Sequence, residues 1–274
     1  MNMIYLLCTL LLCSMSSLQS VIVLCDLGGT FLDVNKMSYA KEELGLGLLV
    51  ANGLTNGLQF NPQQRIFQTL EKIGGTQDAI RHEASQVPLP KLYCDWMSGA
   101  HTDALEIRTN ILREVDQLYS AGFFSSWFEY HIIYRALKAM FSAEALVKHL
   151  RPIEPMIGLL ERIDQKEHSL VAITNWDPHS FPLFLVSPVG QKISKLIAEK
   201  DMIVSGYIGQ NKPYASFYEH VFAIYGHDMN NYLYIDDNPD NINAARALGI
   251  SSILYSGDAR VVEQELIARG IIKS

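Results

Sequence analysis

The chain has 274 residues, within the range of one elaborated domain, and 49% of them are hydrophobic, which is enough for a large buried core. Its 22 basic and 29 acidic residues give a net charge of −7, and no cluster of lysine or arginine stands out. We therefore predict no nucleic-acid partner, because such proteins concentrate positive charge against the phosphate backbone.

Residues 1–20 differ in character from the rest of the chain. An apolar run at residues 4–13 is followed by serines. The run is too short to cross a bilayer as a helix, so we predict no stable membrane span. Its length suits a signal-peptide core, in which case the protein is exported, to a periplasm or out of the cell; otherwise it is cytoplasmic. A true start at Met15 and a buried N-terminal extension also fit the segment.

The first predicted strand covers residues 21–25 (VIVLC), which are apolar throughout and rich in β-branched side chains. Asp26 and the pair Gly28–Gly29 follow it directly. Continuous apolar character is typical of a central strand in a parallel sheet, where helices cover both faces.

Helical signals dominate from about residue 34 to residue 150. Asn61, Pro62 and Gln64 predict a capped helix start. Residues 104–118 and 127–140 carry apolar side chains at a spacing of three to four. We therefore predict a bundle of helices inserted after the first strand.

Strands and helices alternate from residue 153 onward. The predicted strands cover residues 169–173, 202–204, 232–235 and 252–255, and the predicted helices cover residues 156–163, 192–198, 216–224, 241–248 and 261–268. Such alternation indicates a parallel sheet with helices on both faces. We predict an α/β fold with a Rossmann-like core formed by residues 21–33 and 151–274, and a helical bundle at residues 34–150.

Polar residues follow three of the predicted strands, at the edge where ligands bind in such sheets. Together with one lysine from a loop, they are Asp26, Thr174–Asn175, Lys212 and Asp236–Asp237. The set suits phosphoryl transfer, in which a carboxylate attacks phosphorus while donors and a cation hold its oxygens. Crowded carboxylates repel one another, and Mg²⁺ with oxygen ligands relieves the repulsion. Helix capping is the plainer interpretation of the threonine, the asparagine and the paired acids.

Four segments resemble, in order, the four motifs of the haloacid dehalogenase (HAD) superfamily. They are residues 25–33 (CDLGGTFLD), 173–175 (ITN), 205–213 (SGYIGQNKP) with Tyr218 beyond, and 234–241 (YIDDNPDN) with AARALG at 244–249. The resemblance covers the chain from about residue 21 to its end. Residues 34–150 lie where this family places its first-type helical cap.

The resemblance implies a role for each candidate residue. Asp26 would be the nucleophile, and Lys212 and Thr174 would act with it in catalysis. Thr174, Asn175 and Lys212 would bind the phosphoryl group. The implied Mg²⁺ ligands are Asp26, the carbonyl group of Gly28, Asp236 and Asp237, with Asp237 in direct contact. The implied activity is that of a magnesium-dependent phosphatase acting on a small phosphorylated metabolite through an aspartyl-phosphate.

Gly28 departs from the pattern of the family's phosphatases, which usually carry a second aspartate there as general acid and base. The carbonyl group can still bind a metal, but the proton donor to the leaving group is missing. Asp177 and His179 are candidate donors by position, and a good leaving group would need none. Two alternatives stay open: carbon–halogen hydrolysis, which needs the nucleophile but no metal, and a HAD-fold binding protein without catalysis.

Overall fold

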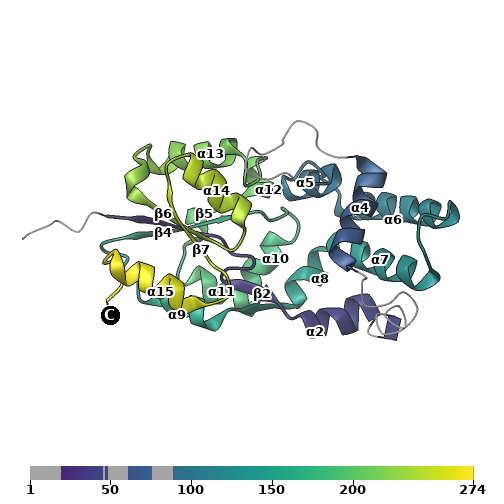
Figure 1. Ribbon diagram of the computed structural model, residues 1–274, viewed down its shortest axis with the longest axis horizontal. Helices are drawn as coiled ribbons and strands as arrows, with labels where there is room; N and C mark the ends of the chain where they lie inside the picture. The colour runs from purple at the N-terminus through teal and green to yellow at the C-terminus, as the bar shows by residue number, and fades with distance from the viewer. Residues whose placement is uncertain (1–19, 46, 49–60, 76–88, 274) are drawn as a thin grey trace, which may run out of the picture.

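The computed structural model describes residues 20–45, 47–48, 61–75 and 89–273. Its central sheet has the strand order β5–β4–β1–β6–β7, and all neighbouring strands are parallel (Figure 1). The strands are β1 (Ile22–Cys25), β4 (Ser169–Thr174), β5 (Met202–Val204), β6 (Tyr232–Asp236) and β7 (Ser251–Leu254). The predicted α/β fold with a Rossmann-like parallel sheet is confirmed.

Helices cover both faces of the sheet. In β1, Val23 and Cys25 pack into one layer and Leu24 packs into the other, because successive side chains of a strand alternate. This two-sided burial explains why the strand is apolar throughout. The first layer contains α9 (Glu154–Glu161), α10 (Phe181–Val186), α11 (Pro188–Ser194) and α15 (Ala259–Ala268); the second contains α13 (Ala215–Tyr225) and α14 (Pro239–Ala247).

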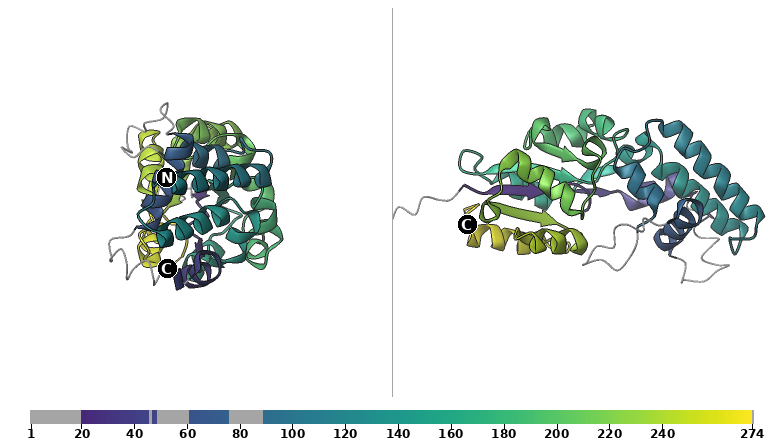
Figure 2. Two further views of the ribbon diagram at one scale, coloured as in Figure 1. Left: turned by 90° about the vertical axis from the view of Figure 1, so that its right-hand side faces the viewer. Right: turned by 90° about the horizontal axis from the view of Figure 1, so that it is seen from above.

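A second group of helices lies in the chain between β2 (Leu32–Val34) and β3 (Leu150–Pro152). Its described members are α2 (Lys36–Tyr39), the π-helical η1 (Ala40–Gly45), α4 (Pro62–Gly74), α5 (Lys91–Met97), α6 (Ala104–Ser120), α7 (Trp127–Met140) and α8 (Ala143–Lys148). Among these inserted helices, α4, α5, α6 and α7 pack around a core of their own, which includes Leu70, Ile111 and Ile133. They lie beyond the end of the sheet at which β1 finishes (Figures 1 and 2).

Capping side chains define where the inserted helices begin. The Oδ1 atom of Asn61 accepts a hydrogen bond from the backbone N–H of Gln64 at 3.2 Å, and Pro62 is the first residue of α4, as the sequence predicts. Likewise, the Oγ atom of Ser126 accepts from the N–H of Glu129 at 3.1 Å at the start of α7. The helices predicted at residues 104–118 and 127–140 are confirmed as α6 and α7.

The two connections between the sheet and the inserted helices run side by side. Strands β2 and β3 pair in antiparallel register, with Leu32 opposite Pro152 and Val34 opposite Leu150. The predicted boundaries near residues 34 and 150 fall within this β2–β3 ribbon. Each of its strands has three residues, too few for a periodic signal, so the sequence analysis missed both.

One predicted helix is wrong in its bounds. Instead of covering residues 192–198, α11 begins at Pro188 and ends at Ser194. The start is set locally, because the Oγ atom of Ser187 accepts a hydrogen bond from the N–H of Gly190 at 3.0 Å. The preceding α10 (FPLFLV) was missed, since six nearly uniformly apolar residues carry no helical period.

The apolar run at residues 4–13 lies outside the described residues. Among those that are described, none of the helices combines the length and apolar composition needed to cross a membrane. Export of the protein stays a prediction.

Candidate active site

The predicted site residues from the strand ends and from one loop meet at the carboxyl end of the sheet. Strands β4, β1 and β6 are neighbours, and they end at Thr174, before Asp26 and at Asp236, respectively. The N–H of Asp26 donates to the carbonyl of Ile235 at 3.0 Å, which extends the β1–β6 ladder to the candidate nucleophile. Thr174 is 1% exposed and ends β4, the strand that pairs with β1, and Asn175 follows it.

Lys212 supplies a buried cation between two of the acids. Its Nζ atom donates to Oδ1 of Asp26 at 2.6 Å, to Oδ2 of Asp236 at 2.9 Å and to the hydroxyl of Tyr234 at 3.1 Å. Lys212 is 1% exposed, Asp26 5% and Asp236 fully buried. Water therefore screens these charges little, and the ammonium group is held by three partners.

Asp236 has the most crowded carboxylate of the site. Its Oδ1 accepts from the N–H of Asn238 at 2.7 Å, and its Oδ2 accepts from Lys212, from Tyr234 and, at 2.9 Å, from Nδ2 of Asn241. Four donors use most of the acceptor capacity of a carboxylate. Asp236, predicted as a metal ligand, thus lies in the acidic cluster with its oxygens engaged in fixing Lys212 and the following loop.

Asn175 holds the backbone of Lys212 from both sides. Its Nδ2 donates to the carbonyl of Lys212 at 2.7 Å, and its Oδ1 accepts from the N–H of the same residue at 2.8 Å. The sequence predicts that Asn175 binds phosphate. In the structure both ends of its amide are engaged with Lys212, which makes Asn175 a positioning residue for the lysine.

We expect Asn175→Ala to destabilise the protein by about 1–3 kcal/mol, because a buried backbone donor and acceptor lose their partners. Chemical denaturation measures this change. The matched control is Asn230→Ala, which removes an exposed amide whose hydrogen-bond partner among the described residues is Asp228, two positions away. Equal stability of the two variants would contradict a positioning role for Asn175.

Asp237 is the least engaged of the three acids. Its Oδ1 accepts a hydrogen bond from the hydroxyl of Thr30 at 3.2 Å, and the residue is exposed. The carboxyl group fills the space beside Gly29, where a Cβ would lie 2.3 Å from Oδ2 of Asp237. Gly29 also has a φ of +85°, so both its conformation and its close approach to Asp237 require a glycine.

The site contains more acidic than basic side chains. Burial raises the pKa of Asp26 to about 8, and Asp236 and Asp237 add to the rise while Lys212 opposes it. Burial and Asp236 also raise the pKa of Asp237. Burial alone would lower the pKa of Lys212, but Asp236 and Asp26 outweigh it and hold that pKa above its ordinary value. One lysine thus faces three acids, an arrangement that a further cation would stabilise.

The donor set fits a magnesium ion. Asp26, Asp236 and Asp237 each offer a carboxylate oxygen, and these oxygens lie within 4.8 Å of one another. Mg²⁺ prefers oxygen ligands and is bound through one or two carboxylates while it keeps several waters. Asp26 and Asp237 have the least engaged oxygens, so they are the residues that would hold the ion, whereas the carbonyl of Gly28 stays a predicted ligand.

We expect the affinity for Mg²⁺ to rise with pH up to about pH 8. The ion competes with the proton on Asp26, whose pKa is about 8, so below that pH each pH unit changes the affinity about tenfold when one proton is displaced. Titration calorimetry at pH 6 and pH 7, in two buffers of different ionisation enthalpy, measures both the affinity and the proton release. An affinity that is the same at both pH values would contradict binding by Asp26.

The two candidate proton donors after β4 are engaged elsewhere. Both oxygens of Asp177 accept hydrogen bonds around the start of α10, including one from the N–H of Ser180 at 2.8 Å and one from the Ser180 hydroxyl. Nε2 of His179 lies 2.8 Å from the carbonyl of His101, and its ring stacks on Trp96 at 5.0 Å. These contacts give both residues structural partners and leave the donor unassigned.

The sequence analysis assigned no role to two residues of this network, Tyr234 and Thr30. Tyr234 lies two positions before Asp236 on β6, so the alternation of a strand already places both on one face. Thr30 lies within the first motif, next to the glycine turn. Asn241, at the end of the fourth motif, donates a hydrogen bond to Asp236. The hydroxyl of Tyr218 donates to the carbonyl of Asn241 at 3.0 Å and supports it from α13.

The inserted helices contact the sheet domain again next to the site. Nδ2 of Asn211, the residue before Lys212, donates to the carbonyl of Cys94 in α5 at 3.0 Å. Close by, the backbones of Gly99 and Gly206 meet, since a Cβ at Gly99 would lie 2.3 Å from the carbonyl oxygen of Gly206. The inserted helices therefore border the acidic cluster from the side opposite the strands.

Comparison with known proteins identifies the family. Residues 110–255, slightly more than half of the chain, match the model of the haloacid dehalogenase-like hydrolases. The chain therefore belongs to that family, and the expected resemblance is confirmed.

Solved structures share the fold. A predicted HAD-like family hydrolase from Porphyromonas gingivalis is similar with a TM-score of 0.53 and 18% identity, over 92% of this chain and 98% of that chain. A HAD family enzyme from Bacteroides thetaiotaomicron, solved as an aspartate-to-alanine mutant in complex with magnesium and inorganic phosphate, is similar with a TM-score of 0.50 and 16% identity, over 87% and 96%. Among curated proteins, drimenol cyclase drtB from Aspergillus calidoustus is 33% identical over 60 residues, which are 22% of this chain and 11% of that protein.

Proposed function

We propose that this HAD-like hydrolase is a magnesium-dependent phosphatase of a small phosphorylated metabolite. The observation that carries the proposal is the hydrogen bond from Lys212 to Asp26, set beside the two further acids Asp236 and Asp237. A carboxylate so placed has one oxygen fixed by a cation and the other left to attack. The bound Mg²⁺ would neutralise charge on the phosphoryl oxygens.

The chain's own residues would act in two steps. In the first, an oxygen of Asp26 attacks phosphorus, the bond to the ester oxygen breaks, and the leaving alkoxide takes its proton from water, since no side chain is assigned as its donor. In the second, water hydrolyses the aspartyl-phosphate, which releases phosphate and restores the carboxylate. Lys212 and Thr174 would hold the phosphoryl oxygens as charge spreads over them, and Asn175 and Asp236 would keep Lys212 in place. The inserted helices would serve as a cap that limits the entry of water.

Carbon–halogen hydrolysis is the second candidate, and Gly28 favours it. That reaction also uses an aspartate as nucleophile, but halide leaves without a proton, so it needs no acid at position 28. The three clustered acids favour the phosphatase, because they repel one another unless a cation lies among them.

A release assay separates the candidates. The protein is incubated with a panel of phosphate monoesters and 2-haloacids, with Mg²⁺ or with a chelator, and free phosphate and halide are measured. We expect phosphate release that the chelator abolishes. Halide release in the chelator would establish the dehalogenase instead. A folded protein that releases neither would favour a binding protein without catalysis.

A further inference from the structure

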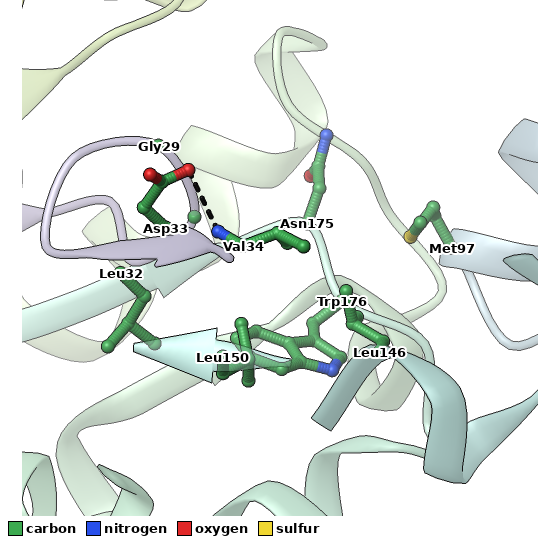
Figure 3. Close-up of a pocket in the computed structure, with 10 residues that line it drawn as sticks. Gly29, Leu32, Asp33, Val34, Met97, Leu146, Leu150, Asn175 and Trp176 are labelled. Carbon is green, nitrogen blue, oxygen red and sulfur yellow. Dashed lines mark hydrogen bonds between the residues drawn. The ribbon is translucent and has the colours of Figure 1, made fainter. Parts of the chain in front are cut away.

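A cavity of about 250 Å³ opens beside the nucleophile loop (Figure 3). Its side-chain walls come from the β2–β3 ribbon, from the residue after Asn175, and from the inserted helices. The apolar side chains that line it are Leu32, Val34, Met97, Leu146, Leu150 and Trp176. Figure 3 shows these side chains around the cavity, with Val34 and Asn175 drawn above Trp176 and Leu150 in this view.

The polar side chains in the walls already have partners. Asp33 accepts from the N–H of Val34 at 2.8 Å and from the guanidinium of Arg151 at 2.7 Å. The amide of Asn175 is hydrogen-bonded at both ends to the Lys212 backbone. The indole N–H of Trp176 donates to the hydroxyl of Ser180 at 2.8 Å, away from the cavity. A bound group would therefore meet hydrocarbon surface and few free side-chain donors, which disfavours a polyhydroxyl group such as a sugar.

The cavity shares its wall with the acidic site. Gly28 and Gly29, two and three residues after Asp26, line it, and so does Asn175, which holds Lys212. A Cβ at Gly28 would meet no atom within 4 Å, so the space that an aspartate side chain would enter belongs to the opening. A phosphate monoester whose phosphorus lies next to Asp26 could thus extend its ester group into the cavity.

We propose that this cavity binds the hydrocarbon part of the substrate, which makes the substrate a phosphate monoester of an apolar alcohol. The inference rests on the proposed phosphatase activity. An apolar cavity of about 150 Å³ is large enough for benzene. This cavity is larger, so it has room for a longer or branched hydrocarbon.

The test is a series of esters that differ only in chain length. Methyl, butyl, hexyl and octyl phosphate have leaving groups of similar basicity, so differences in kcat/KM report binding of the chain. We expect roughly a fourfold rise in kcat/KM per added methylene until the cavity is full, which is the fold-change of about 0.8 kcal/mol per buried CH₂. Glycerol phosphate, which is polar, should be a poorer substrate than butyl phosphate.

A pair of matched variants tests whether the preference for longer alkyl chains arises in the cavity. Leu146→Asn places an amide of similar size in the wall, and we expect it to flatten the dependence on chain length. Leu105→Asn makes the same change on α6, where the side chain is 62% exposed, and should keep the slope. Binding of alkylphosphonates, whose C–P bond is not hydrolysed, to the unaltered protein with Mg²⁺, measured by calorimetry, gives the same slope without turnover.

The outcomes distinguish the two proposals. Phosphate release, or phosphonate binding, that does not grow with chain length would overturn the apolar subsite and leave the phosphatase standing. A slope that survives in Leu146→Asn would place the hydrocarbon elsewhere. If no ester is hydrolysed and no phosphonate binds, methylphosphonate included, the proposed phosphatase fails and the subsite inference fails with it.

Discussion

Asp26→Asn should lower the rate of phosphate release by roughly 10⁴-fold or more. Removing the nucleophile alone typically lowers the rate nearly as much as removing all the catalytic residues that act with it. Asparagine has the same shape and can still accept a hydrogen bond from Lys212, so the fold around it should persist. Initial rates of phosphate release with saturating Mg²⁺ measure the effect. The matched control is Asp258→Asn, at a partly exposed residue that caps α15 and pairs with Arg260, since asparagine caps a helix equally well.

The same variant should be more stable than the wild type when Mg²⁺ is removed. The folded-state pKa of Asp26, about 8, lies above its ordinary value of 3.8, so the folded protein holds this proton more tightly than the unfolded chain does. The wild type therefore loses stability from this group as pH rises from about 4 to about 8, and asparagine has no such loss. Denaturation in chelator should show that the variant exceeds the wild type in free energy of unfolding by more at pH 8 than at pH 5. A wild-type protein that is the more stable of the two at pH 8 would contradict this assignment.

Gly28→Asp should raise the rate on esters with poor leaving groups by roughly 10²- to 10⁴-fold, the usual contribution of a general acid. The position accepts a side chain, because a Cβ there meets no atom within 4 Å and Gly28 is not among the glycines with positive φ. A carboxyl group two residues after the nucleophile would reach the leaving oxygen from the cavity side. The measurement is kcat on ethyl phosphate, because its ethoxide is a poor leaving group.

Gly28→Asn is the control for this gain, since it has the size of aspartate but no acidic proton. A gain that is the same in both variants would assign the effect to filling the cavity. A gain in Gly28→Asp that is as large for a good leaving group, such as nitrophenol, would also argue against proton donation. Either variant should weaken the preference for long alkyl chains, because it places a polar group at the mouth of the apolar cavity.

The sheet could be predicted from the sequence because the signals for its strands are local. A strand such as residues 21–25, buried on both faces, is recognisable by its composition, and the polar residues after β1, β4 and β6 meet once the strands are parallel. The position of Lys212 could not be predicted from local signals. It reaches Asp26 from a loop 186 residues away, which strand patterning does not place; the chemistry of the candidate set called for a cation, and the resemblance to a family implied its role.

The details of the network could not be predicted from single residues. Asn175 was expected at the phosphate, yet both ends of its amide are hydrogen-bonded to the backbone of Lys212, a pairing that depends on how two loops pass each other. Asp236 and Asp237 are neighbours in sequence, but Asp236 is buried with four hydrogen bonds and Asp237 is exposed. The β2–β3 ribbon depends on pairing across more than 110 residues, which local composition does not encode.

The meeting of Gly99 and Gly206 has a mechanical consequence. The carbonyl oxygen of Gly206 lies where a Cβ of Gly99 would be, so the spacing between the two halves of the molecule depends on the absence of a side chain at Gly99. In Gly99→Ala the added methyl group would push the inserted helices away from Gly206, because the atom it meets belongs to the backbone and not to a flexible side chain. The inserted helices would then rotate about the β2–β3 ribbon, since its two paired strands join them to the sheet.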